Sequence, residues 1–330
     1  MNGTTTAQLA EKTAKAVTGS VEEWTGFLQS AARLYKYSYP EQLLIYAQRP
    51  DATACASYEI WNQTMRRYVR RGARGIALPD GAGAVRYVFD VADTGARKSS
   101  REVKTWALDE NNREAVAHAL ETQYGSAAKL GIAGQLEEIA MQQSMDYWQW
   151  HQDELRGIVD GSFLEGYDEL NLEIAFRNTA AASVKYMLLS RCNLAREYQI
   201  EPEELAGVLE WNTSAASGAL GSAVSELSEG VLRQIERTIR QYERSQNHDE
   251  RTDVYEERRV LDSRSDSNRT VGDTEQIRTD AGAVSEGASD DHLQQPAPER
   301  EADRAPDGDR PGGGESDGGD RAGAGEAKWC

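Results

Sequence analysis

The first hundred residues combine helical periodicity with short alternating segments. Residues 22–36 place apolar side chains at helical spacing, and "YPEQLLIYAQRPD" follows as a second helix with Pro40 in its first turn. The stretch "SYEIWNQT" predicts a third, short helix with Ser57 as its N-cap. The segments "RRYVRRG", "GIALPDG" and "AVRYVFDVADT" then alternate or are rich in β-branched and aromatic residues, which predicts a small antiparallel meander.

From about residue 109 onward the pattern is helical. The predicted helices span 109–124, 132–159, 167–191, 202–210 and 225–243, and Gly125, Gly161 and the run "NTSAASGALGS" separate them. The predicted helix 167–191 has one apolar face, as in a helix packed against others. This face carries Leu172, Phe176, Ala180, Val184, Met187 and Leu188. We expect these helices to form a bundle with an acidic exterior.

The composition changes again after about Ser245. No aromatic residue occurs between Tyr255 and Trp329, and "GDRPGGGESDGGDRAGAGEA" is rich in Gly, Asp and Arg. Such a segment buries too little apolar surface to offset its chain entropy, which predicts disorder. The predicted fold is therefore an α+β N-terminal domain, an α-helical domain and a disordered tail. The expected ranges are 1–20 for a flexible N-terminus, 21–104 for the α+β domain, 105–244 for the helical domain and 245–330 for the acidic tail.

Charge is distributed unevenly over these parts. The chain of 330 residues has a formal net charge of −18, yet residues 1–104 carry +5, residues 105–240 carry −12 and residues 241–330 carry −11. A split of this kind indicates a polyanionic partner for the front part alone.

Sequence motifs for catalysis or metal binding do not occur. There is no HExxH, no CxxC, no phosphate-binding GxxxxGK[ST] loop and no GxSxG, and the four histidines are far apart. We therefore expect no enzyme activity, no cofactor and no metal. The three cysteines (Cys55, Cys192 and Cys330) form no paired framework, and no signal peptide or membrane-spanning run is evident, so we expect a cytoplasmic protein without membrane contact.

Positive charge is concentrated between residues 66 and 74. Five arginines occupy these nine positions, with Tyr68 among them: Arg66, Arg67, Arg70, Arg71 and Arg74. On a strand, Arg66, Tyr68 and Arg70 share one face at intervals of about 7 Å, close to the repeat of a single-stranded nucleic acid. Arginines neutralise phosphates and an aromatic ring stacks on any base. A solvated hairpin edge, or a strip for an acidic protein, would show the same pattern.

Two residues outside this segment complete the candidate nucleic-acid site. Trp61 lies at the apolar end of the third helix, where core packing is the simpler interpretation. Lys36 stands at the end of the first helix and would extend the positive track. Gly72 and Gly75 are expected to form backbone turns between the arginines.

The run "FLQSAARLYKYSYPEQLLIYAQRPDATACASYEIWNQTMRRYVRRGARGIAL" resembles the N-terminal domain of ArdC-type antirestriction proteins. Segments such as "IYAQRPDA", "RGARGIAL", "YVFDVADT" and "YMLLSRC" are also similar to the N-terminal region of large mobile-element proteins with helicase and methylase regions. The likeness covers about residues 20–243. It implies a single-stranded DNA-binding domain of a plasmid or conjugative element, with partners among the helicase, methylase or conjugation proteins of that element.

Trp61, Arg70, Gly72, Arg74 and Gly75 match the family's core of a Trp followed by two basic-Gly steps. The chain lacks the metallopeptidase region of ArdC-type proteins and the helicase and methylase motifs of the larger ones, which favours a truncated or split version. The sequence therefore predicts a non-catalytic single-stranded DNA-binding protein. The alternative is an acidic protein-interaction or DNA-mimic antirestriction module that acts on a nuclease or a transfer complex.

Overall fold

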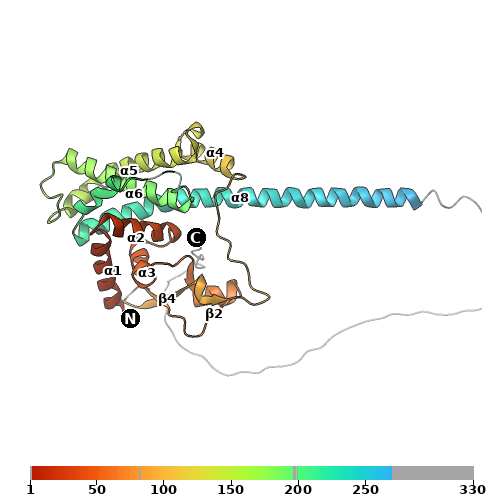
Figure 1. Cartoon of the computed structure of the whole chain (residues 1–330), viewed down its shortest axis with the longest axis horizontal. Coiled ribbons are helices and arrows are strands. Elements are labelled where there is room, and N and C mark those ends of the chain that lie inside the picture. Colours follow the sequence, from red (N-terminus) through yellow and green to blue (C-terminus); the bar gives the residue numbers. More distant parts are fainter. Residues whose placement is uncertain (1, 82, 196–197, 199, 270–330) are drawn as a thin grey trace, which may run out of the picture. The chain divides into compact units, whose positions relative to one another are not determined.

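The computed structural model describes residues 2–81, 83–195, 198 and 200–269. The described residues up to Arg251 belong to one compact unit, and the expected domain boundary between residues 104 and 105 falls inside it. The unit is mostly helical and contains a small antiparallel sheet, so its composition is α+β (Figure 1). None of the helices in the described ranges combines the length and the apolar character needed to span a bilayer.

Three helices open the chain: α1 (Gly3–Val17), α2 (Val21–Arg33) and α3 (Tyr39–Gln48). Each has a polar cap, because Asn2 accepts the Thr5 amide, Ser20 accepts the Glu23 amide, and Ser38 forms a capping box at α3. The sequence predicts a flexible N-terminus at 1–20, and in the structure residues 3–17 of it form helix α1. The helix persists because α1 buries its own apolar side chains, Ala14 and Val17, and packs along α3.

The sheet contains β1 (Cys55–Ser57), β4 (Val85–Asp90) and β3 (Ile76–Pro79), antiparallel and in that order. The β3–β4 hairpin confirms the second half of the predicted meander. The first half is wrong, since β2 (Tyr68–Val69) does not join this sheet but pairs with β5 (Thr94–Gly95) in a separate two-stranded ribbon. Two short helical turns connect these strands: η1 (Ile60–Thr64) and η2 (Val91–Asp93).

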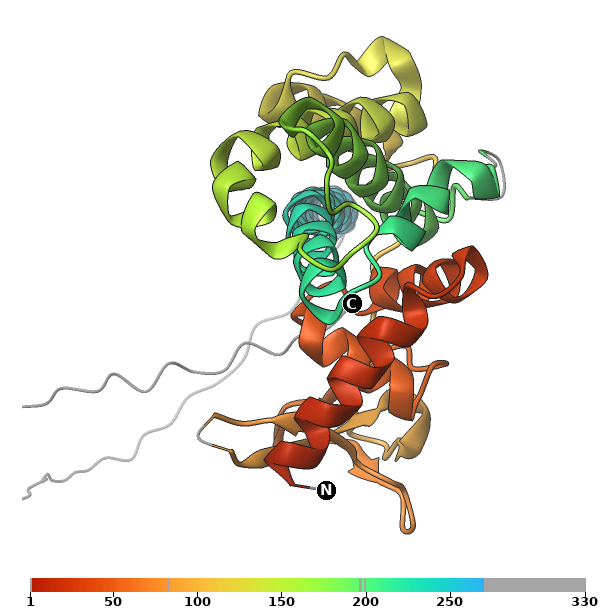
Figure 2. The ribbon, with the colours of Figure 1, turned by 90° about the vertical axis from the view of Figure 1, so that its left-hand side faces the viewer.

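The helical part confirms the five predicted helices to within a few residues, except for the start and the end of the last one. It consists of α4 (Arg113–Tyr124), η3 (Ala128–Leu130), α5 (Gly131–Ile158), α6 (Glu169–Arg191), α7 (Pro202–Leu205), η4 (Ala206–Glu210) and α8 (Ser214–Arg269). Helices α5 and α6 pack against each other along much of their length. Helix α2 packs against α6, so the N-terminal helices are in direct contact with the later ones (Figures 1 and 2).

Helix α8 begins earlier and ends later than the pattern predicts. The run at 212–222, expected to separate helices, is helical from Ser214, because its small residues permit close packing: a Cβ on Gly221 would lie 2.1 Å from the Tyr39 ring. The helix also continues through 245–269, which were assigned to the disordered tail. No Gly or Pro occurs between residues 231 and 271 to end it. The remainder of the predicted tail, 270–330, lies outside the described residues.

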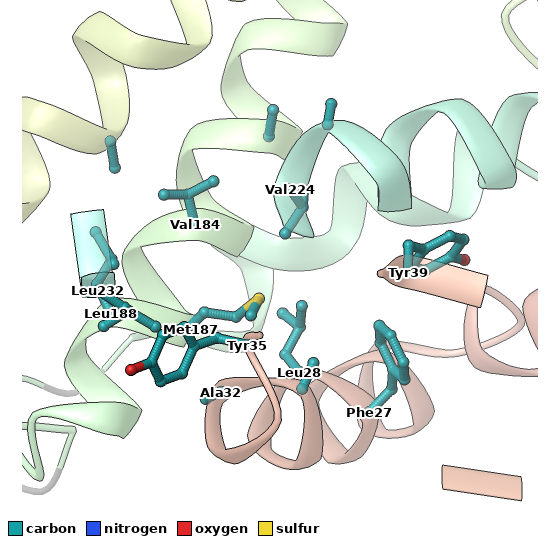
Figure 3. Close-up of a cluster of buried hydrophobic side chains, with 14 of the residues drawn as sticks. Phe27, Leu28, Ala32, Tyr35, Tyr39, Val184, Met187, Leu188, Val224 and Leu232 are labelled. Carbon is teal, nitrogen blue, oxygen red and sulfur yellow. The ribbon is translucent and has the colours of Figure 1, made fainter. Parts of the chain in front are cut away.

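One continuous hydrophobic core joins the two halves of the unit. Figure 3 shows Leu28 of α2 close to Met187 of α6 and Val224 of α8, and Phe27 of α2 beside Tyr39 of α3; all five are buried. Polar groups cross the same boundary, since the Trp24 indole N–H donates to Ser183 Oγ at 3.0 Å. Because this core has no break, the basic front of the sequence folds on the acidic helices.

A buried ion pair lies beside this core. Lys36 Nζ is 2.6 Å from Glu236 Oε2, and their side chains are 8% and 10% exposed. Glu236 also accepts hydrogen bonds from the Tyr35 hydroxyl at 2.6 Å and from Arg240 Nε at 2.8 Å. Burial raises the pKa of Glu236, but the bonds from Lys36, Tyr35 and Arg240 outweigh it and hold that pKa below the usual value of a carboxyl.

Replacing Glu236 by Gln is expected to lower the free energy of unfolding by about 3–5 kcal/mol, because the buried Lys36 ammonium loses the charge of the carboxylate 2.6 Å away. A folded-state pKa below the unfolded one stabilises the protein above the unfolded pKa, and this stabilisation is lost as the pH falls through the folded pKa. Urea unfolding at several pH values would show the gap between wild type and E236Q closing in acid. The double variant K36M/E236M should recover most of the loss; equal stability of wild type and E236Q at neutral pH would contradict the role of the pair.

Two glycines of α8 give a matched test of its packing. Gly221→Ala is expected to destabilise the unit by about 1–3 kcal/mol, because the new Cβ overlaps the Tyr39 ring. Gly218→Ala should stabilise it by about 0.5–1 kcal/mol, since nothing lies within 4 Å of the added Cβ and Ala favours the helix. Thermal unfolding of the two variants, measured side by side, checks the opposite signs. Similar Tm values for both would mean that α8 does not rest on Tyr39.

Candidate nucleic-acid interface

The β2–β5 ribbon holds the arginine segment against the rest of the chain. Tyr68 pairs with Gly95 and Val69 with Thr94, and the Arg70 amide donates to the Asp93 carbonyl at 2.8 Å. Arg66 precedes the ribbon in a left-handed conformation with φ +53°. The backbone therefore turns at Arg66, and the expectation that the segment is a regular strand with two alternating faces is wrong.

Beyond β2 the chain forms a tight loop that projects from the unit (Figure 2). The Ala73 amide donates to the Arg70 carbonyl, and Gly72 has φ +86°, so Gly72 has the turn role predicted for it. Gly75 has a different role: a Cβ there would lie 3.0 Å from Tyr87 Cδ1, so this glycine permits close packing. Arg70, Arg71 and Arg74 are exposed around this loop.

A second basic segment lies beside the first. The Arg101 amide donates to the Met65 carbonyl at 2.9 Å, and Ser100 Oγ donates to the Arg66 carbonyl at 2.7 Å. These bonds place 97–101 along 65–68. We define the basic lobe as residues 65–75 and 94–101; its cations are Arg66, Arg67, Arg70, Arg71, Arg74, Arg97, Lys98 and Arg101. The last three were missed from the sequence, although "ARKSSR" is a basic run that would have marked them.

Tyr68 is the exposed aromatic residue of the basic lobe. Its side chain is 41% exposed, and its ring lies directly over Gly95, where a Cβ would be 2.3 Å from the ring. The Arg97 guanidinium carbon lies 5.4 Å from the centroid of that ring. Gly95 and Arg97 thus hold the ring in place at the surface, with positive charge beside it.

The lobe cations differ in how far they are already engaged. Arg67 is half-buried and donates from Nε to Thr94 Oγ1 at 2.8 Å, so it braces β5. Arg70 Nη1 donates to the Ala92 carbonyl at 3.3 Å and stays exposed. Among the residues that the structure describes, none of the eight lobe cations forms an ion pair with a carboxylate.

Two acidic residues that precede β5 in sequence, Asp90 and Asp93, are bound to other groups. Arg49 Nη1 lies 2.6 Å from Asp93 Oδ2, and this bond raises the pKa of Arg49. The buried Asp90 carboxylate accepts the backbone amides of Thr53, Ala54 and Ala92. These two carboxylates are therefore turned toward other partners. Glu102, which directly follows the lobe, is exposed and lies 4.0 Å from Lys104, so the eight lobe cations still outnumber the exposed acid beside them.

Two residues predicted for the site lie away from the surface. Trp61 is fully buried, donates its indole N–H to the Phe89 carbonyl at 2.9 Å, and packs with Met65 in a small cluster under the lobe. Lys36 is buried in its ion pair with Glu236. Neither side chain reaches a nucleic acid on the surface. Trp61 supports the lobe from beneath, and Lys36 belongs to the core.

The described residues contain no cluster of three or more His, Cys, Asp or Glu side chains that could hold a metal ion. Cys55 and Cys192 are both buried as free thiols, and burial raises the pKa of the Cys192 thiol to about 12. A thiol of that kind is not a nucleophile at neutral pH.

Comparisons of this chain with protein-family models, with curated proteins and with solved structures find no match. The similarity to ArdC-type N-terminal domains therefore stays an expectation drawn from the sequence. The chemistry of the basic lobe is the observation from which a function follows.

Proposed function

We propose that the chain binds single-stranded DNA through the basic lobe, without catalysis and without strong sequence preference. The observation that carries this proposal is the basic lobe itself: eight cations, none in an ion pair with a carboxylate within the described part of the chain, together with the exposed Tyr68 ring. Arginines at this density neutralise successive phosphates and release their counterions. An exposed ring beside them stacks on a base of any identity.

The way the cations are presented favours a single strand over a duplex. They stand on a two-residue ribbon and its flanking loops, and no helix of the described lobe offers side chains to a major groove. Stacking on Tyr68 requires a base that is not already stacked between neighbours. Direct base readout needs fixed bidentate side chains, whereas the exposed lobe arginines suit the phosphate backbone.

The biological setting is proposed from the sequence likeness. A single-stranded DNA-binding chain similar to ArdC-type N-terminal domains would serve a mobile or conjugative element during transfer or in protecting its entering strand. Its partners would then include the helicase, methylase or conjugation proteins of the same element, in the cytoplasm. The lobe supports the DNA-binding part of this setting, since transfer of such elements proceeds through single-stranded DNA.

Arg70→Glu combined with Arg71→Glu is expected to weaken binding of a labelled single-stranded oligonucleotide at least tenfold. The two side chains are exposed loop residues, so the fold should persist. Loss of two phosphate contacts should also flatten the slope of log K against log salt by about 1.4, at about 0.7 per phosphate for single strands. Fluorescence anisotropy of the full chain across a salt series measures both effects.

Lys12→Glu with Lys15→Glu is the matched control, because it makes the same change in net charge at two exposed lysines of α1. It should leave affinity within about twofold, since the change lies outside the lobe and is screened by salt. Equal losses in the two double variants would show a general charge effect. Unchanged affinity in a well-folded R70E/R71E protein would reduce the arginines to a solvated edge or a protein-docking strip.

Tyr68→Ala is expected to lower affinity for the oligonucleotide by about 5- to 150-fold, the equivalent of one lost stack at about 1–3 kcal/mol. The salt slope should stay unchanged, because no phosphate contact is removed. Tyr198→Ala is the control, since Tyr198 is similarly exposed (49% against 41%) and lies in the helical part. Anisotropy titrations across the same salt series measure both the affinity and the slope. Retention of full affinity by the Tyr68 variant would remove stacking from the mechanism.

A further inference from the structure

A groove of about 940 Å³ runs along the outer face of α6. Its floor is α6 from Asn171 to Lys185, one wall is α5 at Glu137 and Met141, and the other is formed by α7 and η4. Gly207 brings η4 close to α6, because a Cβ there would lie 2.4 Å from Thr179 Oγ1. The floor from Asn171 to Lys185 is about 21 Å long, because an α-helix rises 1.5 Å per residue. We call this feature the α6 groove.

The α6 groove has exposed apolar side chains along its edges. Ile174 is 45% exposed, Met141 41% and Tyr167 42%. Leu170, one turn before Ile174 on the same helix, is 63% exposed and extends the row. Small residues such as Ala181 and Ala182 line the floor, which leaves space for incoming side chains. Large apolar groups gathered on one face, unlike scattered ones, mark a contact surface.

The same groove is acidic. Its described lining contains five carboxylates and one cation, Lys185; the carboxylates are Glu137, Asp168, Glu203, Glu204 and Glu210. Lys185 Nζ bridges the walls at 2.8 Å from Glu137 and 3.1 Å from Glu204. Burial lowers the pKa of Lys185, but the two carboxylates outweigh it and raise that pKa, so the bridge stays charged at neutral pH. The remaining carboxylates leave the groove with net negative charge.

We infer that the α6 groove binds a basic amphipathic helix of a partner protein. The apolar row accepts the apolar face of such a helix, and the carboxylates on the walls pair with the Lys and Arg residues that flank that face. A floor of about 21 Å accommodates about four helical turns. This site is distinct from the basic lobe in both elements and charge, so it adds a function to the proposed one.

The charge and shape of the α6 groove argue against three other occupants: nucleic acid, the chain's own residues 270–330 and a second copy of the chain. Nucleic acid is repelled by the carboxylates. The chain's own residues 270–330 carry 15 Asp/Glu against 6 Lys/Arg, so that segment has the same sign of charge as the groove. A second copy of this chain would have to offer its basic lobe, which is built of loops and a ribbon rather than an apolar helix face.

The test is a titration of the full chain with a fluorescent 14-residue peptide that has Leu and Lys at helical spacing. A second peptide of identical composition, with its Leu residues spread over all faces, measures non-specific attraction to an acidic protein. We expect the amphipathic peptide to bind at least tenfold more tightly than the scrambled one. Equal binding of the two peptides, or no binding of either, would overturn the inference.

Matched variants locate the binding. Ile174→Ser removes apolar surface from the groove, and Leu130→Ser does the same outside it at a similar exposure, 47% against 45%. Glu203→Gln with Glu210→Gln removes two groove charges, whereas Glu110→Gln with Glu114→Gln removes two at and just before the start of α4. The groove variants should each weaken the amphipathic peptide at least fivefold and the controls less than twofold. Equal effects, or dimerisation that Ile174→Ser abolishes, would overturn the inference.

Discussion

The buried pair of Lys36 and Glu236 holds the front of the chain to the last helix. It joins the connection between α2 and α3 to α8 across 200 residues of sequence. The apolar core around it is non-directional and tolerates small shifts, whereas a buried charge displaced from its partner is left without compensation. Tyr35 and Arg240 also donate hydrogen bonds to the Glu236 carboxylate. The Trp106 indole N–H in turn donates to the Tyr35 hydroxyl at 3.1 Å. The pair therefore adds a directional restraint on α8 to the close packing of Gly221 against Tyr39.

Two of the acids beside the basic lobe are held by groups outside it. Asp90 is committed to three backbone amides and Asp93 to Arg49, and both arrangements lie at the turn between β4 and β5. In the helical part the opposite holds: arginines at Arg177, Arg233 and Arg240 pair with carboxylates one turn away. Many cations of the helices are therefore in ion pairs, whereas the described lobe cations are not. Local geometry, and not the number of charges, produces the positive surface.

Local signals in the sequence predicted local structure well. Pro40 in the first turn of α3, Ser57 as a cap and the apolar face of α6 each depend on residues a few positions apart. Non-local features were out of reach: Lys36 resembles a surface cation until its partner 200 residues away is known, and β2 pairs with β5 through contacts that no alternation encodes. The left-handed Arg66 is a backbone state that favours Gly or Asn, and nothing in the residue type announces it.

A chain with a net charge of −18 attracts a polyanion only if the local field outweighs the remote one. At physiological ionic strength charges farther away than about 8 Å are largely screened, so a phosphate at the lobe responds to the arginines around Tyr68 and hardly to the acidic helices. At lower ionic strength the screening length grows and the helices begin to repel the same strand. The acidic α6 groove acts under the same rule on a partner of opposite sign. Screening by salt therefore allows one acidic molecule to present two surfaces of opposite preference, each defined within a few ångströms of its own side chains.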